Sequence, residues 1–185
     1  MRQIRNNVFE TNSSSMHSIA ISKGPIAGLP ESIYFYLGEY GWEFSNVSPA
    51  GYLYTAIMTI YDKKDRDNKL NKLKSVLDSH GIKYEFEAPK FDSDGWLENG
   101  YIDHREELNT FVETVLSDED MLMRLLFGNS CVFTGNDNSD PEEQAYIERW
   151  NSTIEEYDYE TEKTIIRENP YYMERDNYDW FYKGN

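Results

Sequence analysis

The spacing of apolar residues changes repeatedly along this chain, and this change is the strongest constraint on its fold. Leu70, Leu73 and Leu77 recur at helical spacing, whereas residues 82–87 alternate apolar and charged side chains as a strand with one solvated face does. The same patterns predict strands over residues 18–22, 32–36, 82–87 and 130–134, and helices from residue 49, around 70–77, over 105–116 and over 118–127. These elements do not follow βαβ spacing, so we expect an α+β fold, an antiparallel sheet with helices packed on one face.

We expect a single domain. The chain has 185 residues, enough to bury a core, and no Pro/Gly/Ser-rich linker divides it. Residues 1–139 are interpreted as the α+β core with a polar N-terminal site, and residues 140–185 as an acidic, aromatic helix and extension of the same domain. This helix is expected to begin at Pro141, after an Asp140 N-cap, and to continue through Trp150 and Ile154.

The compartment follows from cysteine content and from the N-terminus. Cys131 is the only cysteine, so no intramolecular disulfide can form and a reducing cytosol is expected. Arg2 and Arg5 are not followed by an apolar segment, so we expect no signal peptide, and the longest nearly uncharged apolar stretch, 50–60, is too short to span a membrane.

Charge is distributed unevenly along the chain. The net charge is −16, but residues 1–30 balance to +2 while residues 140–185 hold 13 acidic and 5 basic side chains. Such a chain is repelled by free nucleic acid and anionic membranes. We therefore expect a basic protein as its partner.

The polar tract at residues 10–18 is the first candidate site. Thr11, Ser18 and three consecutive serines place five hydroxyls within nine residues, together with the amide of Asn12 and the imidazole of His17. Such a loop can direct several donors toward one anion, and Arg5 can add a phosphate clamp. The predicted phosphate-binding residues of this tract are Arg5, Asn12, Ser13, Ser14 and Ser15, and its predicted catalytic residues are Glu10 and His17. The alternative is an ordinary loop with local side-chain caps.

Two later segments carry the other candidate residues. Asp103 and His104 are possible catalytic groups, with His17 and His104 as base and acid around a phosphodiester, although Asp103 also fits a helix N-cap. Asn136, Asp137 and Asn138 follow a predicted strand and are assigned to phosphate binding, with a plain turn as the alternative.

Several classes of site are excluded by missing motifs. The chain has no Walker A, GxGxxG, GxSxG, HExxH or paired CxxC motif, and it has too few Cys and His residues for structural zinc. We therefore expect no cofactor and no metal site, with a magnesium site built from Glu10, Asp103 and Asp137 as the open alternative.

Two regions are candidates for partner binding. Lys63, Lys64 and Arg66 begin the one basic stretch of the chain, residues 62–74, which can meet an RNA backbone or be a solvated helix face. Trp180 lies among aromatic and acidic residues near the C-terminus, a composition that suits an interface with a basic protein or a segment packed on the core.

Residues 5–18, RNNVFETNSSSMHS, resemble the N-terminus of proteins from phages and prophages of Gram-positive bacteria, which carry a similar VFETNSSSxHS run and mostly have no assigned function. Residues 100–104 and 135–138 look like later motifs of the same group. By type, phage origin, small size and strong acidity also resemble anti-CRISPR proteins against Cas9-type effectors, some of which mimic nucleic acid while others damage guide RNA.

These resemblances imply a phage counter-defence protein in the cytosol of a bacterial host. It would bind a basic effector that handles nucleic acid and would hold or cleave its RNA, as a metal-independent ribonuclease in the catalytic version. The first alternative is an acidic nucleic-acid mimic without catalysis. The second is a nucleotide-binding protein or small-molecule phosphoryl enzyme.

Overall fold

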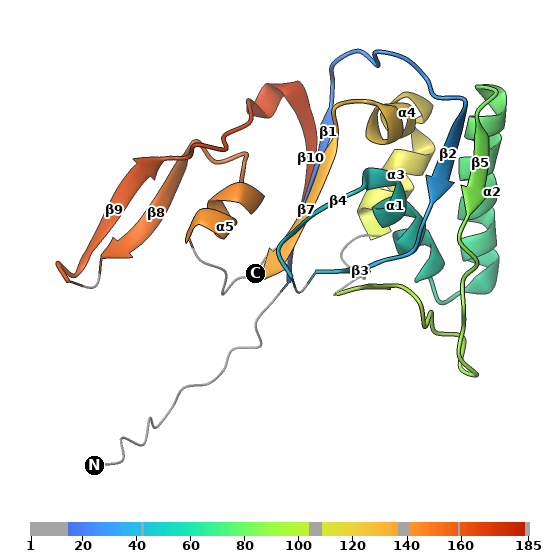
Figure 1. Cartoon of the computed structure of the whole chain (residues 1–185), viewed down its shortest axis with the longest axis horizontal. Helices are drawn as coiled ribbons and strands as arrows, with labels where there is room; N and C mark the ends of the chain where they lie inside the picture. Colours follow the sequence, from blue (N-terminus) through green and yellow to red (C-terminus); the bar gives the residue numbers. More distant parts are fainter. Residues whose placement is uncertain (1–14, 42, 104–108, 137–140, 159, 184–185) are drawn as a thin grey trace.

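A four-stranded antiparallel sheet organises the computed structural model, which describes residues 15–41, 43–103, 109–136, 141–158 and 160–183. Its strand order is β10-β1-β7-β4, and the long strand β1 runs through its middle (Figure 1). The strands of this sheet are β1 (Ser15–Ser22), β4 (Ser45–Val47), β7 (Cys131–Asn136) and β10 (Tyr178–Lys183). Every residue of β1 is buried, because the sheet is covered on both faces.

Three helices cover one face of this sheet. They are α1 (Pro49–Met58), α3 (Asn109–Ser117) and α4 (Glu119–Phe127). Ile19 and Ile21 of β1 point to this side and join the main hydrophobic core with Tyr52 of α1 and Phe111 of α3. Apolar residues at alternating strand positions and at helical spacing therefore meet in one layer, as their periodicities predict.

A second group of elements flanks the helices. Helix α2 (Lys63–Ser79) packs beside a parallel pair, β2 (Ser32–Phe35) and β5 (Lys83–Phe86), while β3 (Glu39–Tyr40) pairs with β6 (Tyr101–Ile102). The Asp62 carboxylate caps α2 by accepting from Asp65 N. Gly81 follows the end of α2 with a φ of 68°, a left-handed conformation that glycine adopts without steric cost.

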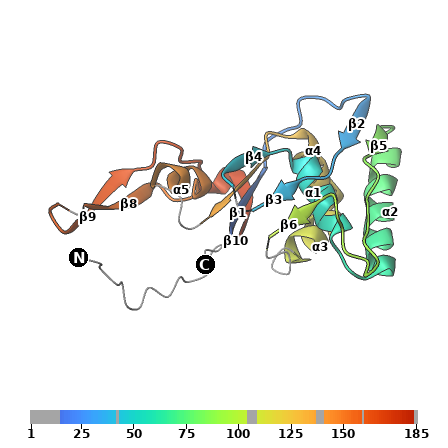
Figure 2. The same cartoon turned by 60° about the horizontal axis from the view of Figure 1, so that its bottom comes forward.

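The opposite face of the sheet is covered by the C-terminal part of the chain (Figure 2). The short helix α5 (Pro141–Ile147) packs there through Ile147, against Met16 of β1 and Phe133 of β7. The α+β class with an antiparallel sheet in a single fold is confirmed. Helices pack on one face as expected, and α5 adds a second, smaller layer on the other.

The predicted helix through Trp150 and Ile154 is wrong. Helix α5 ends at Ile147, and Ile154 lies in β8 (Thr153–Asp158), which pairs antiparallel with β9 (Lys163–Glu168). β-branched residues favour this hairpin over a continued helix, with Ile154 in one strand and Ile165 and Ile166 in the other. A 3-10 turn, Arg175–Asn177, then leads into β10, which joins the sheet beside β1. Among the described residues, no helix is long and apolar enough to cross a membrane.

Candidate functional site

Three sequence segments that were singled out separately lie at one end of the main sheet. Ser15 begins β1 directly opposite Asn136, which ends β7, and His17 lies opposite Thr134. Asp103 follows β6 and approaches the same point, because a Cβ atom placed on Gly41 would lie 2.7 Å from Asp103 Cβ and 3.0 Å from His17 Nε2. The fold therefore brings Ser15, His17, Asp103 and Asn136 into one neighbourhood.

His17 lies inside the sheet and is not part of an open loop. Its side chain is fully buried, with Nδ1 2.8 Å from the Tyr52 hydroxyl and Nε2 3.1 Å from Ser15 Oγ. Ser15, a predicted phosphate donor, begins β1 and is completely buried there, so in this structure its hydroxyl contacts His17 and not solvent. Burial and two hydroxyl neighbours give His17 the environment of a positioned core histidine.

Gly41 makes the close approach of His17 and Asp103 possible. Its φ is 127°, which L-residues with a side chain rarely adopt, and the two short distances leave no room for a methyl group. Gly41 thus acts as a spacer between β1 and the turn after β6.

Asp103 is held by β6 and by a neighbouring phenol. The Tyr101 hydroxyl donates to Asp103 Oδ1 at 2.5 Å, and Asp103 N donates to Tyr40 O at 3.0 Å. Burial and the hydrogen bond to Asp103 raise the pKa of Tyr101 to about 12. Tyr101 therefore stays protonated at neutral pH, and its one O–H is already donated to the Asp103 carboxylate.

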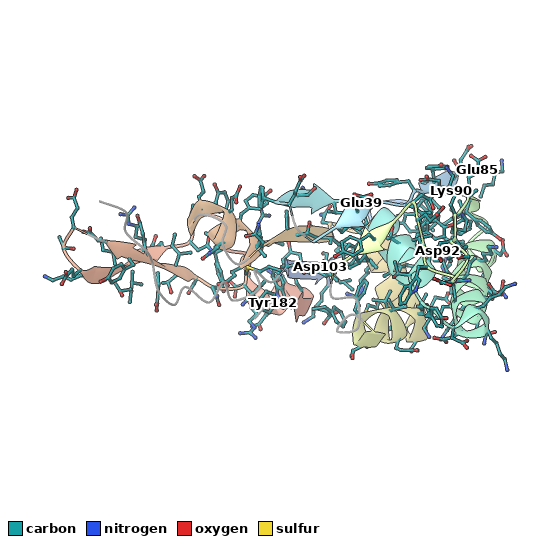
Figure 3. All side chains as sticks on the ribbon, turned by 90° about the horizontal axis from the view of Figure 1, so that it is seen from below. Glu39, Glu85, Lys90, Asp92, Asp103 and Tyr182 are labelled. Atoms are coloured by element: carbon teal, nitrogen blue, oxygen red, sulfur yellow. The ribbon has the colours of Figure 1, made fainter. Side chains whose placement is uncertain are left out.

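A pocket of ≈ 280 Å³ opens beside these residues. Its described lining consists of Glu39, Tyr40, Glu43 and Tyr101, and Figure 3 shows Glu39 and Asp103 in the central part of the molecule. The carboxylates of Glu39 and Glu43 in this lining repel a phosphate. Binding an anion there requires positive charge from outside this lining.

Tyr40 forms the buried side of this pocket. Its ring occupies the space that a side chain at Gly38 would need, with the hydroxyl 2.3 Å from the corresponding Cβ position. Thr55 Oγ1 already accepts from Gly38 N and donates to Gly51 O, and the Tyr40 hydroxyl has no hydrogen-bond partner among the described residues. Burial, with a smaller contribution from Tyr36, raises the pKa of Tyr40 to about 12.

The second feature of functional interest is the β8–β9 hairpin, which projects from the body of the molecule (Figure 1). One of its faces, which we call the hairpin face, is fully exposed and consists of Thr153, Glu155, Tyr157, Thr164, Ile166 and Glu168. Tyr157 is 49% exposed and Ile166 is 66% exposed. On the same face, Glu155 is the neighbour of Tyr157 along β8, and Glu168 is the neighbour of Ile166 along β9. Exposed apolar groups with an acidic rim are typical of a surface that binds a basic protein.

The base of the hairpin is firmly attached. Buried Asn169 donates from Nδ2 to Ala145 O, Glu148 O and Asn151 O at 3.0, 3.3 and 3.0 Å, and its Oδ1 accepts from Tyr171 N. These contacts satisfy carbonyls at the end of α5, where a helix leaves its last acceptors unpaired. The hairpin is thereby held in a defined direction.

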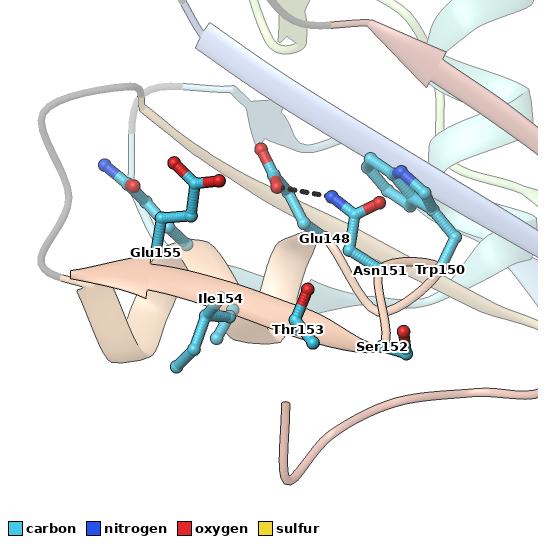
Figure 4. Close-up of a pocket in the computed structure, with 9 residues that line it drawn as sticks. Glu148, Trp150, Asn151, Ser152, Thr153, Ile154 and Glu155 are labelled. Atoms are coloured by element: carbon cyan, nitrogen blue, oxygen red, sulfur yellow. Dashed lines mark hydrogen bonds between the residues drawn. The ribbon is translucent and has the colours of Figure 1, made fainter. Parts of the chain in front are cut away.

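A ≈ 530 Å³ pocket lies between α5 and the start of β8. Figure 4 shows its lining, which includes Glu148, Glu155 and the indole of Trp150, with Asn151 Nδ2 donating to Glu148 at 2.8 Å. An indole face beside two carboxylates is an environment for a cation.

The predicted partner-binding residues have different positions. Lys63 and Lys64 are exposed at the start of α2. Arg66, in contrast, is only 8% exposed and its Nη1 donates to Ile60 O at 3.0 Å, so its role in partner binding stays a prediction. Trp180 lies in β10 with its ring 5.6 Å from that of Trp150, partly buried against the sheet.

Some predicted residues lie outside the described part of the chain. They are Arg5, Glu10, Asn12, Ser13, Ser14, His104, Asp137 and Asn138. The described residues include no cluster of three or more His, Cys, Asp or Glu side chains that could hold a metal ion.

Sequence reasoning missed Tyr52, Gly41 and the hairpin face. Tyr52 lies on the core side of α1, and its hydroxyl reaches His17. Gly41 gives no pattern, because its role depends on what the fold places on either side. The hairpin was hidden by a helix prediction, although the close spacing of Thr and Ile in 153–166 favours strands.

No protein-family model, curated protein or solved structure matches this chain.

Proposed function

We propose that this protein binds a basic protein through the hairpin face. The observation that carries the proposal is the β8–β9 hairpin itself, which is exposed on one whole face and anchored at its base by Asn169. Residues 153–168 contain six acidic and two basic side chains. A basic surface complements this charge, and an acidic one is repelled.

Tyr157 and Ile166 would supply the apolar centre of the interface. Aromatic anchors surrounded by a polar rim provide most of the binding energy in many interfaces. Glu155 and Glu168 sit next to these anchors along their strands, so they would pair with lysine or arginine at the edge of the contact.

The anchored base favours tight binding. A loop that must become ordered on binding loses part of its interaction energy, whereas a hairpin already held by Asn169 and by Met173 N donating to Arg149 O does not. The pocket beside Trp150 would accept one cationic side chain of the partner, between Glu148 and Glu155.

The specific target that we propose is a Cas9-type effector in the cytosol of a bacterial host. Such an effector holds its heteroduplex in a positively charged channel, which suits a partner of net charge −16. This supports a counter-defence role of the phage type that the N-terminal tract suggests.

The test measures binding of the full chain to a purified Cas9-type effector with its guide RNA, by biolayer interferometry at two salt concentrations, alongside target-DNA cleavage. We expect inhibition of cleavage and an association rate that falls as salt rises. The variant Tyr157→Ser/Ile166→Ser should weaken binding by about tenfold or more, since both side chains are exposed and leave the core intact.

Charge is tested with matched pairs. Glu155→Gln/Glu168→Gln removes two carboxylates of the hairpin face, and Glu31→Gln/Glu98→Gln removes two exposed carboxylates elsewhere. Only the first pair should slow association. Equal effects of both pairs on the association rate, or a full chain that neither binds the effector nor inhibits its cleavage, would contradict the proposal.

A second candidate function is favoured by the convergence of Ser15, His17, Asp103 and Asn136 at one end of the sheet. The proposal here is that this end holds an RNA phosphodiester, with positive charge supplied from outside the described lining, and that His17 transfers a proton during its cleavage. Labelled guide RNA is incubated with the protein, with and without the effector, and run on a denaturing gel. RNA shortened by the wild type but not by His17→Gln supports catalysis, and intact RNA in every lane contradicts it.

A further inference from the structure

A ≈ 560 Å³ pocket lies at the opposite end of the molecule from the hairpin, between α2 and residues 86–95. Figure 3 shows the two ends, with α2 beside the labelled Glu85, Lys90 and Asp92. Helix α2 contributes Lys63, Arg66, Leu70 and Lys74, which follow one another at helical spacing on one side of the helix. This volume is in the range of small-molecule sites.

The pocket carries positive charge that this protein does not use for its own ion pairs. Lys63 and Lys74 have no ion pair among the described residues. Lys69, on the same helix, shows the contrast, since its Nζ lies 2.6 Å from carboxylate oxygens of both Asp65 and Glu113. In a chain of net charge −16, two lysines without an ion pair on one pocket leave positive charge available for an anionic ligand.

Arg66 makes this a built site and not a set of surface lysines. The residue is 8% exposed, its guanidinium stacks 4.1 Å over the Phe91 ring, and one hydrogen bond, from Nη1 to Ile60 O, is found for it in the described part of the chain. A guanidinium carries five N–H donors, so others are left for a ligand in the pocket.

One wall of the pocket is apolar. Phe86 and Phe91 line it together with Leu70, and Lys74 Nζ lies 5.4 Å from the Phe86 ring centroid. Arg66 covers one face of Phe91 and Phe35 stacks on one face of Phe86, so a nucleobase would contact the parts of these rings that remain uncovered, while the cations attract its phosphate.

The charge balance of the lining favours a small anionic group, either free or at the end of a strand. Asp67 and Glu87 oppose the three cations, and the Glu87 carboxylate is already bonded to Leu37 N at 2.9 Å. A long polyanion would also meet the acidic remainder of the protein.

We propose that this pocket binds a single nucleotide, with the base against the Phe86 and Phe91 side and the phosphate at the lysines. The nucleotide is either free or the exposed terminal unit of an RNA strand, and the two sources share this chemistry. The inference does not rest on partner binding by the hairpin face, which lies at the other end of the molecule.

The test is isothermal titration calorimetry of the full chain with AMP, UMP, adenosine and inorganic phosphate at low salt. We expect 1:1 binding of a mononucleotide, and weaker binding of adenosine or phosphate alone because each fills half of the site. A short 5′-phosphorylated RNA is the second arm. Tighter binding of the RNA than of the mononucleotide assigns the site to a strand end, and the reverse assigns it to a free nucleotide.

Matched variants locate the binding. Lys63→Gln/Lys74→Gln changes two lining lysines, and Lys64→Gln/Lys72→Gln changes two exposed lysines of the same helix outside the pocket lining. The first pair should raise Kd by about tenfold or more, the second by about twofold or less. No binding of either the mononucleotides or the RNA, or equal effects of the two pairs, would overturn the assignment.

Discussion

The Gly41→Ala variant is the sharpest probe of how this fold brings His17 and Asp103 together. An added methyl group would lie 2.7 Å from Asp103 Cβ and 3.0 Å from His17 Nε2, in a backbone with a φ of 127°. The substitution therefore adds two separate costs, one from the backbone conformation and one from the displaced neighbours.

The two costs have known sizes. A residue with a side chain in such a backbone conformation costs about 1–3 kcal/mol, and overfilling a packed site costs about 1–3 kcal/mol. After a gain of about 0.4–1 kcal/mol from the stiffer unfolded chain, we expect a loss of roughly 1–5.6 kcal/mol in the free energy of unfolding. At about 2–4 °C per kcal/mol for a chain of this length, Tm falls by roughly 2–22 °C.

Two other glycines separate these contributions. Gly81 has a φ of 68° but nothing within 4 Å of its Cβ position, and Gly28 has neither a positive φ nor a close neighbour. Gly81→Ala should cost only about 1 kcal/mol, and Gly28→Ala should be neutral or slightly stabilising. Urea denaturation of the three variants, followed by tryptophan fluorescence, gives the free energies on one scale.

The double variant Gly41→Ala/Asp103→Gly tests the contact directly. Removing the Asp103 side chain removes the closest atom, so the double variant should recover part of the loss, as a coupling of about 0.5–3 kcal/mol. If Gly41→Ala costs no more than Gly81→Ala, Gly41 is not wedged between His17 and Asp103 and the described site is wrong.

Three further predictions concern single groups. Tyr40→Phe should leave stability at pH 7 unchanged or higher, because it removes a buried hydroxyl without a described partner. The pKa of Tyr40, about 12, exceeds its ordinary value of 10.0, so the contribution of this group to stability is complete below pH 10 and is lost as pH rises to 12. Between pH 9 and pH 11, urea denaturation should therefore show a smaller loss of stability in Tyr40→Phe than in the wild type. Equal losses in the two proteins would contradict this. Asn169→Ala should lower the free energy of unfolding by about 1–3 kcal/mol and expose the hairpin to limited proteolysis. The control Asn46→Ala, at an exposed position, should change the free energy of unfolding by less than about 0.5 kcal/mol. Equal effects of the two variants would show that Asn169 does not hold the hairpin. Burial raises the pKa of the Cys131 thiol to about 11, so its reaction with a disulfide reagent at pH 8 should be about 100-fold slower than in the unfolded chain; equal rates would refute burial of the thiol.

Local periodicity predicted most of the elements in the first two thirds of the chain. Leu73 and Leu77 are fully buried on α2, and residues 83–86 form β5 as their alternation indicates. Local patterns succeed here because these segments have one face toward the core and one toward water. Local patterns failed after Ile147. The residues of β8 contain many carboxylates and give only a weak strand pattern, and this strand is stabilised by its pairing with β9.

The candidate site was predicted in parts but not as a whole. Ser15, His17, Asp103 and Asn136 were chosen for their chemistry, and none of the reasons for choosing them implied that they would meet. Their meeting depends on the antiparallel register Ser15↔Asn136 and on the turn that Gly41 permits. Arg66 was likewise placed by the tertiary structure. Its residue type suggested contact with a partner, whereas in the structure it is buried against Phe91 in the wall of a pocket.

The sequence by itself determined the α+β class, the single antiparallel core and the strong acidity, because these follow from composition and from apolar spacing along the chain. Only the tertiary structure decided that β10 lies beside β1, that His17 is enclosed between Ser15 and Tyr52, and that an acidic hairpin projects at one end while a cationic pocket opens at the other. The physical reason is that register, burial and exposure are properties of residues far apart in the chain, and long-range packing sets all three.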